Sequence, residues 1–258
     1  MPAVPDASTE SVLDRFLANH ADAVDVMGGG PGGRHQRTPD VALCDSGGPV
    51  LYLNQALLLR PVLGLDDPVL DTVEEFFAGL GGRMGMLLSV WPLPDLSPRG
   101  WHLGGHPMFV VRAPGPVRHS PPADVEVRRV TALDDLRAVE RVAIEGYPLD
   151  AARGLPPGAV FGDWFPGSSV GLHLGTLDGE PVAAGAVHVG HGVVNLCFAA
   201  TMPAARRRGV WSAVMWDRVA VDPELPAVAF TSDDSRPGFV KHGFLPITRF
   251  TLFVRAGA

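Results

Sequence analysis

Cysteine and lysine are scarce in this chain. Its 258 residues contain two cysteines, Cys44 and Cys197, too few for a disulfide framework or a zinc ribbon, which indicates a reducing compartment. The one lysine, Lys241, is followed by His242, so the sequence has no GK[ST] element and no P-loop. We therefore expect a protein that does not depend on disulfides and does not bind nucleotides through a P-loop.

Long apolar runs and an excess of positive charge are also missing. No stretch approaches the roughly 18 apolar residues of a membrane helix, and the first residues, MPAVPD, do not resemble a signal peptide. The formal net charge is −7, which argues against binding to nucleic acid through bulk electrostatics. These absences predict a cytoplasmic protein with neither a membrane nor a nucleic-acid partner. Because 46 % of its residues are apolar, the chain can bury one or two cores.

Proline and glycine, by contrast, are abundant and divide the chain. Residues 112–124 (RAPGPVRHSPPAD) are rich in proline, which fixes φ and withholds N–H donors, so they predict an extended connector. The expected units are a first half over residues 1–115, a linker over 116–124 and a second half over 125–258. Both halves follow the order helix, hairpin, strand, helix, strand, which is typical of a mixed α/β sheet and indicates a degenerate duplication.

The pattern of apolar residues predicts the elements of each half. In the first half we expect a helix from Val12 to Val24 capped by Ser8, a hairpin over 41–59, a helix from Asp67 to Ala78, and strands over 86–91 and 108–112. In the second half we expect a helix after a capping-box-like Thr131-x-x-Asp134, strands over 172–177, 181–189 and 193–200, a helix over 210–220, and strands over 227–231 and 250–255. Each half is thus expected to end in its own last strand.

An arginine-rich turn between a strand and a helix is the most informative segment. The strand stops at Pro203, the turn contains Arg206, Arg207 and Arg208, and Gly209 leads into the helix. The free N–H groups of a helix start, its dipole and three guanidinium groups suit an anion such as a pyrophosphate. The spacing alone leaves an ordinary basic turn as the alternative.

At this point the sequence resembles the GNAT superfamily of acetyl-CoA-dependent N-acetyltransferases. Residues 206–211 (RRRGVW) follow its [RQ]-x-x-G-x-[GA] signature up to the last position, with Thr201-x-Pro203 before it. Ser232 and residues 239–244 (FVKHGF) resemble the S…Y-x-x-x-G-F segment that closes such domains. The resemblance covers about residues 125–255 and implies an α/β fold of two GNAT-like halves, of which only the second carries the acetyl-CoA loop. It further implies a V-shaped opening between the fourth and fifth strands of a mixed sheet.

The resemblance also implies which residues would hold acetyl-CoA as a co-substrate, with no metal. The amine of a small molecule would attack the thioester directly, a base would accept its proton, and an acid would protonate the thiolate. The backbone of Phe198, Ala199, Ala200 and Thr201 would hydrogen-bond the pantetheine arm, and the pyrophosphate would lie on Arg206, Arg207, Arg208, Gly209, Val210, Trp211 and Ser212, with Phe239 beside the co-substrate.

Two departures from the family pattern bear on the chemistry. Trp211 stands where a glycine or alanine lets the backbone approach the phosphates, and its indole would crowd them unless it turned away into the sheet. Phe239 stands where the family has the tyrosine that protonates the thiolate, and the chain's two tyrosines, Tyr52 and Tyr147, lie elsewhere. A catalytically impaired protein of the same fold, serving as a ligand- or partner-binding module, is therefore the alternative function.

Glu145, Tyr147 and His188 are the candidates for proton transfer. Glu145 and Tyr147 follow the first helix of the second half, where acceptor sites of the superfamily form, and His188 lies at a strand end next to the expected opening. Glu145 as a solvated helix-end charge and His188 as a structural residue are the plainer interpretations. His191 is three positions from His188 and faces the other side of the strand, so the two cannot chelate one metal.

The first half lacks a counterpart of the arginine-rich loop. Residues 60–68 contain one arginine and place Asp66 and Asp67 where a phosphate would bind. We therefore expect this half to bind no CoA and instead to pack on the second half and shape the acceptor pocket. Both a monomer and a homodimer are consistent with the sequence.

Overall fold

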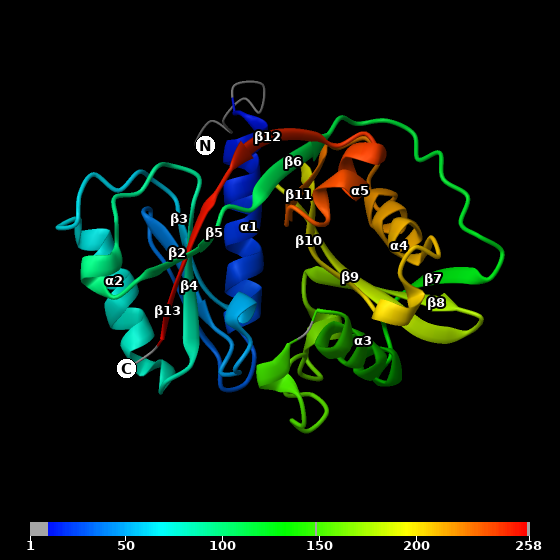
Figure 1. Cartoon of the computed structure of the whole chain (residues 1–258), viewed down its shortest axis with the longest axis horizontal. Coiled ribbons are helices and arrows are strands. Elements are labelled where there is room, and N and C mark those ends of the chain that lie inside the picture. The colour runs from blue at the N-terminus through cyan, green and yellow to red at the C-terminus, as the bar shows by residue number, and fades with distance from the viewer. Residues whose placement is uncertain (1–9, 148, 257–258) are drawn as a thin grey trace, which may run out of the picture.

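The computed structural model describes residues 10–147 and 149–256, which form two mixed β-sheets lying side by side (Figure 1). The first sheet has the order β1 (Arg34–Arg37), β2 (Val41–Asp45), β3 (Asn54–Leu58), β4 (Met84–Ser89), β13 (Thr251–Ala256), β5 (His102–Gly105). The second has the order β12 (Leu245–Arg249), β6 (Met108–Arg112), β11 (Ala227–Thr231), β10 (Val193–Thr201), β9 (Glu180–Gly190), β8 (Val170–Leu177), β7 (Val125–Arg129). The expected mixed α/β fold with two sheets is confirmed.

The helices cover both sheets, and one of them lies between the two (Figure 1). α1 (Val12–Gly28) contacts β2 of the first sheet and β9 and β10 of the second, and α2 (Pro68–Phe77) contributes to the core on the first sheet. α3 (Leu133–Gly146) and α4 (Val210–Val219) both pack on β8, β9 and β10, while α5 (Arg236–Lys241) follows β11. Successive residues of a strand point to opposite faces of the sheet, so β9 contributes to the cores on both faces. Ala184 lies in the core under α3, and Ala183 lies in the core under α4.

The helix starts agree in part with the expected caps. α1 begins at Val12 because Ser11 and Asp14 form a capping box, in which the Ser11 hydroxyl accepts from the Asp14 N–H at 3.1 Å. The expected cap Ser8 lies outside the described residues. Asp67 caps α2 as expected, accepting from the Val69 N–H at 3.1 Å.

The start of α3 differs from its predicted capping box. The N-cap is Ala132, whose side chain cannot accept a hydrogen bond, so the prediction based on Thr131 is wrong by one residue. The helix is instead supported at this end by Asp134 and Asp135 in its first turn, where negative charge is favourable.

Two strands are exchanged between the sheets. β6, from the first half, pairs with β11 and β12, and β13, from the second half, pairs with β4 and β5. The expectation that residues 108–112 and 250–255 complete their own halves is therefore wrong. The two crossing segments meet where the Phe250 N–H donates to the carbonyl oxygen of Pro107 at 2.9 Å. An alternating apolar pattern identifies a strand and its buried face, but not the sheet that it joins.

With this exchange, the two sheets follow the same plan. In the described part of each sheet one pair of neighbouring strands is parallel, β3 with β4 and β10 with β11, and a helix joins each pair: α2 in the first sheet and α4 in the second. The exchanged strand takes the same place in both: β13 lies between β4 and β5 in the first sheet, and β6 lies between β11 and β12 in the second. This equivalence supports the internal duplication.

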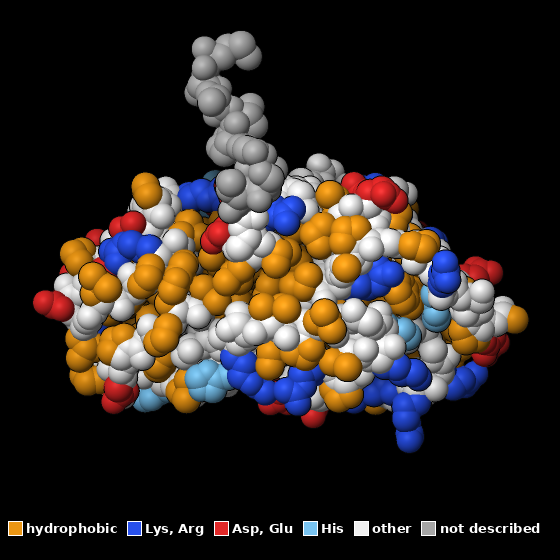
Figure 2. Space-filling model, turned by 90° about the horizontal axis from the view of Figure 1, so that it is seen from above, with side chains coloured by type: hydrophobic (Ala, Val, Ile, Leu, Met, Phe, Trp, Pro, Cys, Tyr) orange, Lys and Arg blue, Asp and Glu red, His pale blue; other side chains and the backbone are white. Residues whose placement is uncertain are grey.

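Some apolar side chains of the molecule are exposed. Figure 2 shows one face of the molecule, with hydrophobic side chains gathered across its middle. The edge strands contribute exposed apolar residues, Leu103 from β5 and Leu245 and Ile247 from β12. None of the described helices is long and apolar enough to cross a membrane.

Candidate functional site

The parallel strands β10 and β11 separate after their first residues. β10 extends to Thr201, but its register with β11 pairs only Val194 with Ala227 and Asn195 with Val228. The pairing of β10 with β9 on its other side shifts between Asn195 and Phe198, which marks a β-bulge at this point. Among the described residues, the rest of the β10 edge therefore has no strand partner on the β11 side, as the resemblance implied.

A cavity of about 700 Å³ occupies this opening and extends between the two halves. Both sheets, α1, the end of α3, α4 and α5 contribute to its wall, which is mostly aromatic and aliphatic. From the first half come His20, Met27, Tyr52, Gln55, Met86 and Leu88, and from the second half Tyr147, Phe161, Cys197, Phe198, Arg218 and Phe230. The first half thus contributes directly to the wall, which agrees with the expectation that it shapes a pocket.

The predicted co-substrate residues lie partly in this wall and partly on the adjoining loop. Phe198, Ala199, Trp211 and Phe239 line the cavity. The other members of the predicted set are not among the lining residues: Ala200, Thr201, Arg206, Arg207, Arg208, Gly209, Val210 and Ser212. Thr201 is nonetheless at the end of β10, and its buried Oγ1 has no hydrogen-bond partner among the described residues.

The three arginines of the loop differ in what they bind. The Arg206 guanidinium donates to the carbonyl oxygens of Thr201 at 3.3 Å and Gly146 at 3.1 Å, so it fastens the end of β10 to the end of α3. Arg208 pairs with Asp124 at 3.0 Å. Arg207 is exposed, has a φ of 64° and makes no hydrogen bond or ion pair within residues 10–147 and 149–256. Of the three side chains, Arg207 is the one left for an anion.

α4 begins without a side-chain cap. Its N-cap is Gly209, with a φ of 87° that favours glycine, so the N–H groups of the first turn have no side-chain acceptor. Val210 is buried beneath the helix, and the Ser212 hydroxyl lies 2.9 Å from Nε2 of His242. The loop and helix start therefore offer backbone donors and one free guanidinium to an anion.

Trp211 turns toward α5 and not into the sheet. Its ring meets that of Phe239 edge to face at 5.0 Å, and a Cβ placed on Gly238 would lie 3.1 Å from the indole. Gly238 therefore allows this close approach between α4 and α5. The indole remains in the wall of the cavity and does not turn away into the sheet.

Among the three candidates for proton transfer, the structure brings only Tyr147 into the cavity wall. Its ring lies 5.3 Å from that of Tyr52 and 5.8 Å from that of Phe198. Burial of the phenol and the neighbouring Tyr52 raise the pKa of Tyr147 to about 12. Glu145 is exposed and His188 is buried behind the wall, where its Nδ1 lies 3.2 Å from the carbonyl oxygen of Ser169.

A buried polar cluster at the cavity wall was not found by sequence reasoning. His20 of α1 donates from Nε2 to the Gln55 side chain at 3.2 Å, and its Nδ1 accepts from the Asn195 amide at 3.4 Å. Burial lowers the pKa of His20 to about 4, so the imidazole is neutral. The cluster joins α1, β3 and β10, which are distant in sequence, and no local spacing indicates such contacts.

Arg218 is a second residue that sequence reasoning missed. Its side chain is fully buried: Nε donates to the carbonyl oxygen of Val214 at 3.1 Å, and Nη1 to those of Ala186 at 3.1 Å and Phe198 at 2.6 Å. It passes over Gly185, where a Cβ would lie 2.7 Å from Cζ. A charged residue four positions after Val214, on the apolar side of the 210–220 helix, was the signal that could have found it.

The first sheet has no equivalent opening in its described residues. β3 and β4 pair at three successive positions, Gln55 with Met86 through Leu57 with Leu88. At the start of α2, Asp67 occupies the place of an anion, and its ion pair with Arg60 holds the pKa of this carboxyl far below its usual range. The first half therefore differs from the second at both places, and its lack of a CoA site stays a prediction.

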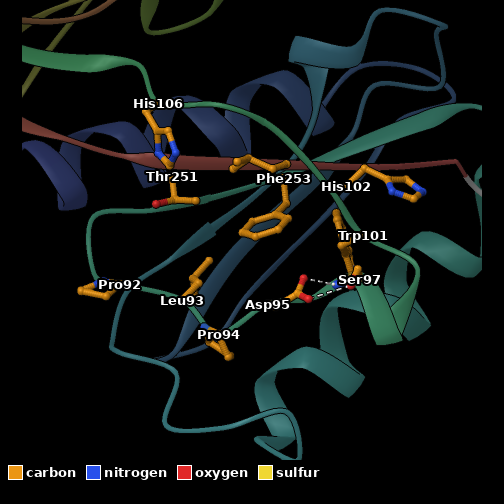
Figure 3. Close-up of a pocket in the computed structure, with 11 residues that line it drawn as sticks. Pro92, Leu93, Pro94, Asp95, Ser97, Trp101, His102, His106, Thr251 and Phe253 are labelled. Atoms are coloured by element: carbon orange, nitrogen blue, oxygen red, sulfur yellow. Dashed lines mark hydrogen bonds between the residues drawn. The ribbon is translucent and has the colours of Figure 1, made fainter.

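A second hollow, of about 480 Å³, lies on the first sheet (Figure 3). Phe253 and Trp101 contribute its apolar wall, and His106 borders both this hollow and the larger cavity. The Asp95 carboxylate accepts locally from the Ser97 N–H at 2.9 Å and hydroxyl at 2.8 Å. No group of three potential metal ligands occurs among the described residues.

Comparison with known proteins gives no match by sequence: no family model and no curated protein matches. By structure the chain is similar to a GCN5-related N-acetyltransferase from Kribbella flavida, with a TM-score of 0.66, 18 % identity, and coverage of 97 % of this chain and 98 % of that chain. A GCN5-related N-acetyltransferase from Sphaerobacter thermophilus gives a TM-score of 0.58 at 16 % identity, covering 98 % of this chain and 95 % of the other.

A tandem GNAT protein from the clavulanic acid biosynthesis pathway is also similar over its whole length. Its TM-score is 0.54 at 16 % identity, and the match covers 98 % of this chain and 97 % of that one. At such identities the similarity shows the fold. The chain therefore has the GNAT fold, with near-complete coverage by a tandem member, as the sequence motifs implied.

Proposed function

We propose that this protein is an acyl-CoA-dependent N-acetyltransferase that transfers an acetyl group from acetyl-CoA to the amine of a small molecule. One observation carries the proposal: the cavity runs through the separation of β10 and β11 and continues between the two halves. Such a cavity offers one end to the acyl donor and another to the acceptor, so both can meet at the free edge of β10.

The residues present fit acetyl-CoA as the donor. The free β10 edge around Phe198 supplies backbone donors and acceptors to a pantetheine amide, and the uncapped start of α4 with Arg207 supplies donors to a pyrophosphate. Trp211 narrows this region by lying against Phe239. Acetyl-CoA supplies the activated acyl group, and the protein binds, orients and shields it.

The charges of the cavity wall favour a largely apolar acceptor. Asp233 is the one carboxylate among the described residues of the wall, and it is already paired with Arg249 at 2.8 Å and Arg236 at 3.2 Å. His20 is neutral and Arg218 is a cation. A polycationic amine therefore has no free counter-charge in this wall, whereas an apolar amine in its neutral, nucleophilic form is accommodated by aromatic and aliphatic side chains.

Tyr147 is the best placed of the proton-transfer candidates. With its pKa at about 12 the phenol stays protonated at neutral pH, so it can donate a hydrogen bond to a leaving group without giving up its proton, and it cannot serve as the base. The proton of the attacking amine passes to water, because no free carboxylate lines the described part of the cavity. Glu145 can act only through such water, since it lies outside the wall.

A thermal unfolding titration with acetyl-CoA tests the proposal. A ligand that binds only the folded state at 100 times its Kd stabilises it by about 2.7 kcal/mol, so the Tm must rise. We expect a rise with acetyl-CoA and acetylation of at least one apolar amine in a panel. No rise at millimolar acetyl-CoA would contradict the enzyme, and a rise without turnover on any amine would indicate a ligand-binding module.

A further inference from the structure

Arg218 has one guanidinium nitrogen to spare, and the residue lies in the cavity wall. Its Nε and Nη1 are fully used by the carbonyl oxygens of Val214, Ala186 and Phe198. Nη2 is buried and has no hydrogen-bond partner among the described residues. A buried donor on a charged group is costly to leave unpaired, so this nitrogen marks a place where a ligand atom completes the structure.

No anion among the described residues neutralises this cation. Its three acceptors are uncharged carbonyl groups, and the adjacent Asp217 carboxylate is bonded to His173 instead. Cys197 lies close by, but burial raises the pKa of its thiol to about 12, so it is uncharged. Burial lowers the pKa of Arg218 only to about 10, and the guanidinium keeps its charge at neutral pH. A buried unpaired charge favours a ligand that brings the opposite charge.

The free donor suits an anion that presents a single atom. A carboxylate is best bound by two parallel N–H bonds from two guanidinium nitrogens, and here only Nη2 is free. The same guanidinium donates from Nη1 to the carbonyl oxygen of Phe198, which lies at the bulge where β10 separates from β11. At the same opening, Phe239 has no proton to give to a departing sulfur.

We propose that Arg218 binds the sulfur of CoA in its thiolate form. The proposal rests on the function proposed above. In the transfer, the amine nitrogen bonds to the acyl carbon, the carbon–sulfur bond breaks with its electron pair remaining on sulfur, and the amine loses one proton to water. The guanidinium pairs with the charge left on sulfur, which a phenylalanine at position 239 cannot neutralise.

Titration of bound CoA by the ultraviolet absorbance of its thiolate tests this directly, without turnover. The full-length protein is saturated with CoA and titrated from about pH 6 to about pH 10, near the ordinary pKa of a thiol. Cys44 and Cys197 do not interfere, because burial raises the pKa of each to about 12. We expect the thiol of bound CoA to ionise at least about tenfold more readily than that of free CoA, a fall of about one pKa unit.

Three variants separate the charge of Arg218 from its packing. Arg218→Met removes the cation and is expected to raise the pKa of the bound thiol above that of free CoA, as burial does for Cys197. Arg218→Lys retains a charge, so the pKa of its bound thiol is expected to lie between the values for the wild type and for Arg218→Met. Gly185→Ala displaces the guanidinium, because the new Cβ would lie 2.7 Å from Cζ of Arg218. Gly171→Ala is the matched control, because the atom nearest to its new Cβ is 3.5 Å away.

The outcomes distinguish this inference from the proposed function. If calorimetry detects no CoA binding to the wild-type protein, the function fails and the inference fails with it. If CoA binds but its thiol pKa is raised in the wild type, Arg218 does not bind a thiolate and only the inference fails. If circular dichroism shows that Arg218→Met does not fold, the inference is still tested by comparing the thiol pKa of CoA bound to the wild type with that of free CoA.

Discussion

Arginines 206, 207 and 208 are adjacent in sequence but have different partners. Because Arg207 alone has no partner among the described residues, we predict that Arg207→Ala weakens CoA binding about tenfold, or ~1.4 kcal/mol, as expected for one charge-assisted contact. Isothermal titration calorimetry measures the change. Arg128→Ala, which removes an exposed arginine paired with Asp135, is the control and is expected to leave the affinity unchanged.

Arg206→Ala is expected to behave differently from Arg207→Ala. The Arg206 guanidinium is bound to the carbonyl oxygens of Thr201 and Gly146, so its loss loosens the junction of β10 and α3. The Tm should fall together with the affinity for CoA, whereas Arg207→Ala should leave the Tm unchanged. Equal loss of affinity with no change in Tm for both variants would contradict this division of roles.

His20 is the residue whose protonation most clearly opposes folding. Its pKa is about 4 in the folded protein, because of burial, against 6.5 for the ordinary group. Between these values the unfolded chain binds a proton that the folded one does not, so stability is complete above about pH 6.5 and falls as the pH drops toward 4. The difference of about 2.5 pKa units corresponds to roughly 3 kcal/mol.

We therefore predict that in His20→Gln the free energy of unfolding decreases less between about pH 6.5 and pH 4 than in the wild type. Urea unfolding at a series of pH values gives the free energies, and His191→Gln, on an exposed histidine paired with Asp22, is the control. A wild-type and a His20→Gln protein with the same slope over this range would show that another group causes it.

At the scale of elements, the sequence predicted long periodic segments better than short edge strands. Helices 12–24 and 210–220 were expected within a few residues because their apolar faces repeat over several turns. β1, with the sequence RHQR, has no buried residue and hence no alternating pattern. Four of the five residues of β12 are exposed, Pro246 among them, as an edge strand permits, so it lacks an alternating pattern of buried apolar residues.

Sequence reasoning proposed the part of the candidate site that lies on one segment, and it missed the part where distant segments meet. The loop 206–212 and the β10 residues 198–201 form a local motif, so a resemblance could identify them. His20, Gln55 and Asn195 come together only through the packing of α1 between the sheets, and Arg218 contacts Phe198 through the packing of α4 on β10. Sequence spacing can place Arg218 on the apolar side of its helix, but it does not show which distant residues these side chains contact.

The crossing of β6 and β13 depends on a cluster of four phenylalanines. Phe250 is buried against Phe230 at 4.4 Å between ring centroids, with Phe16 at 6.0 Å and Phe109 at 6.2 Å. We predict that Phe250→Ala lowers the free energy of unfolding by ~3–5 kcal/mol, the usual loss for a large aromatic side chain in a core. Denaturant unfolding measures it.

The matched control for Phe250→Ala is Leu245→Ala. Leu245 lies in β12, just before the crossing, and its side chain is 64 % exposed, so its replacement should change stability by no more than about 0.5 kcal/mol. A loss below about 1 kcal/mol for Phe250→Ala would mean that the crossing is held by its backbone pairs and not by this cluster.

For the molecule as a whole, the exchange makes each sheet depend on both halves. A fragment of residues 125–258 lacks β6, so β11 and β12 lose the strand between them, and β13 has no sheet to join. A fragment of residues 1–115 lacks β13, which separates β4 from β5. Unpaired strand edges with apolar faces promote aggregation, so neither half is expected to fold alone.

We predict that fragment 125–258 is insoluble when expressed alone and becomes soluble when fragment 1–115 is expressed with it, because the second fragment returns β6 and accepts β13. Solubility, circular dichroism and a cooperative unfolding transition measure this outcome. The control is the full-length chain cut once within residues 116–124, which interrupts the chain but removes no strand and should remain folded. A soluble fragment 125–258 that unfolds cooperatively and binds acetyl-CoA as the full chain does would show that its sheet closes without the exchanged strand.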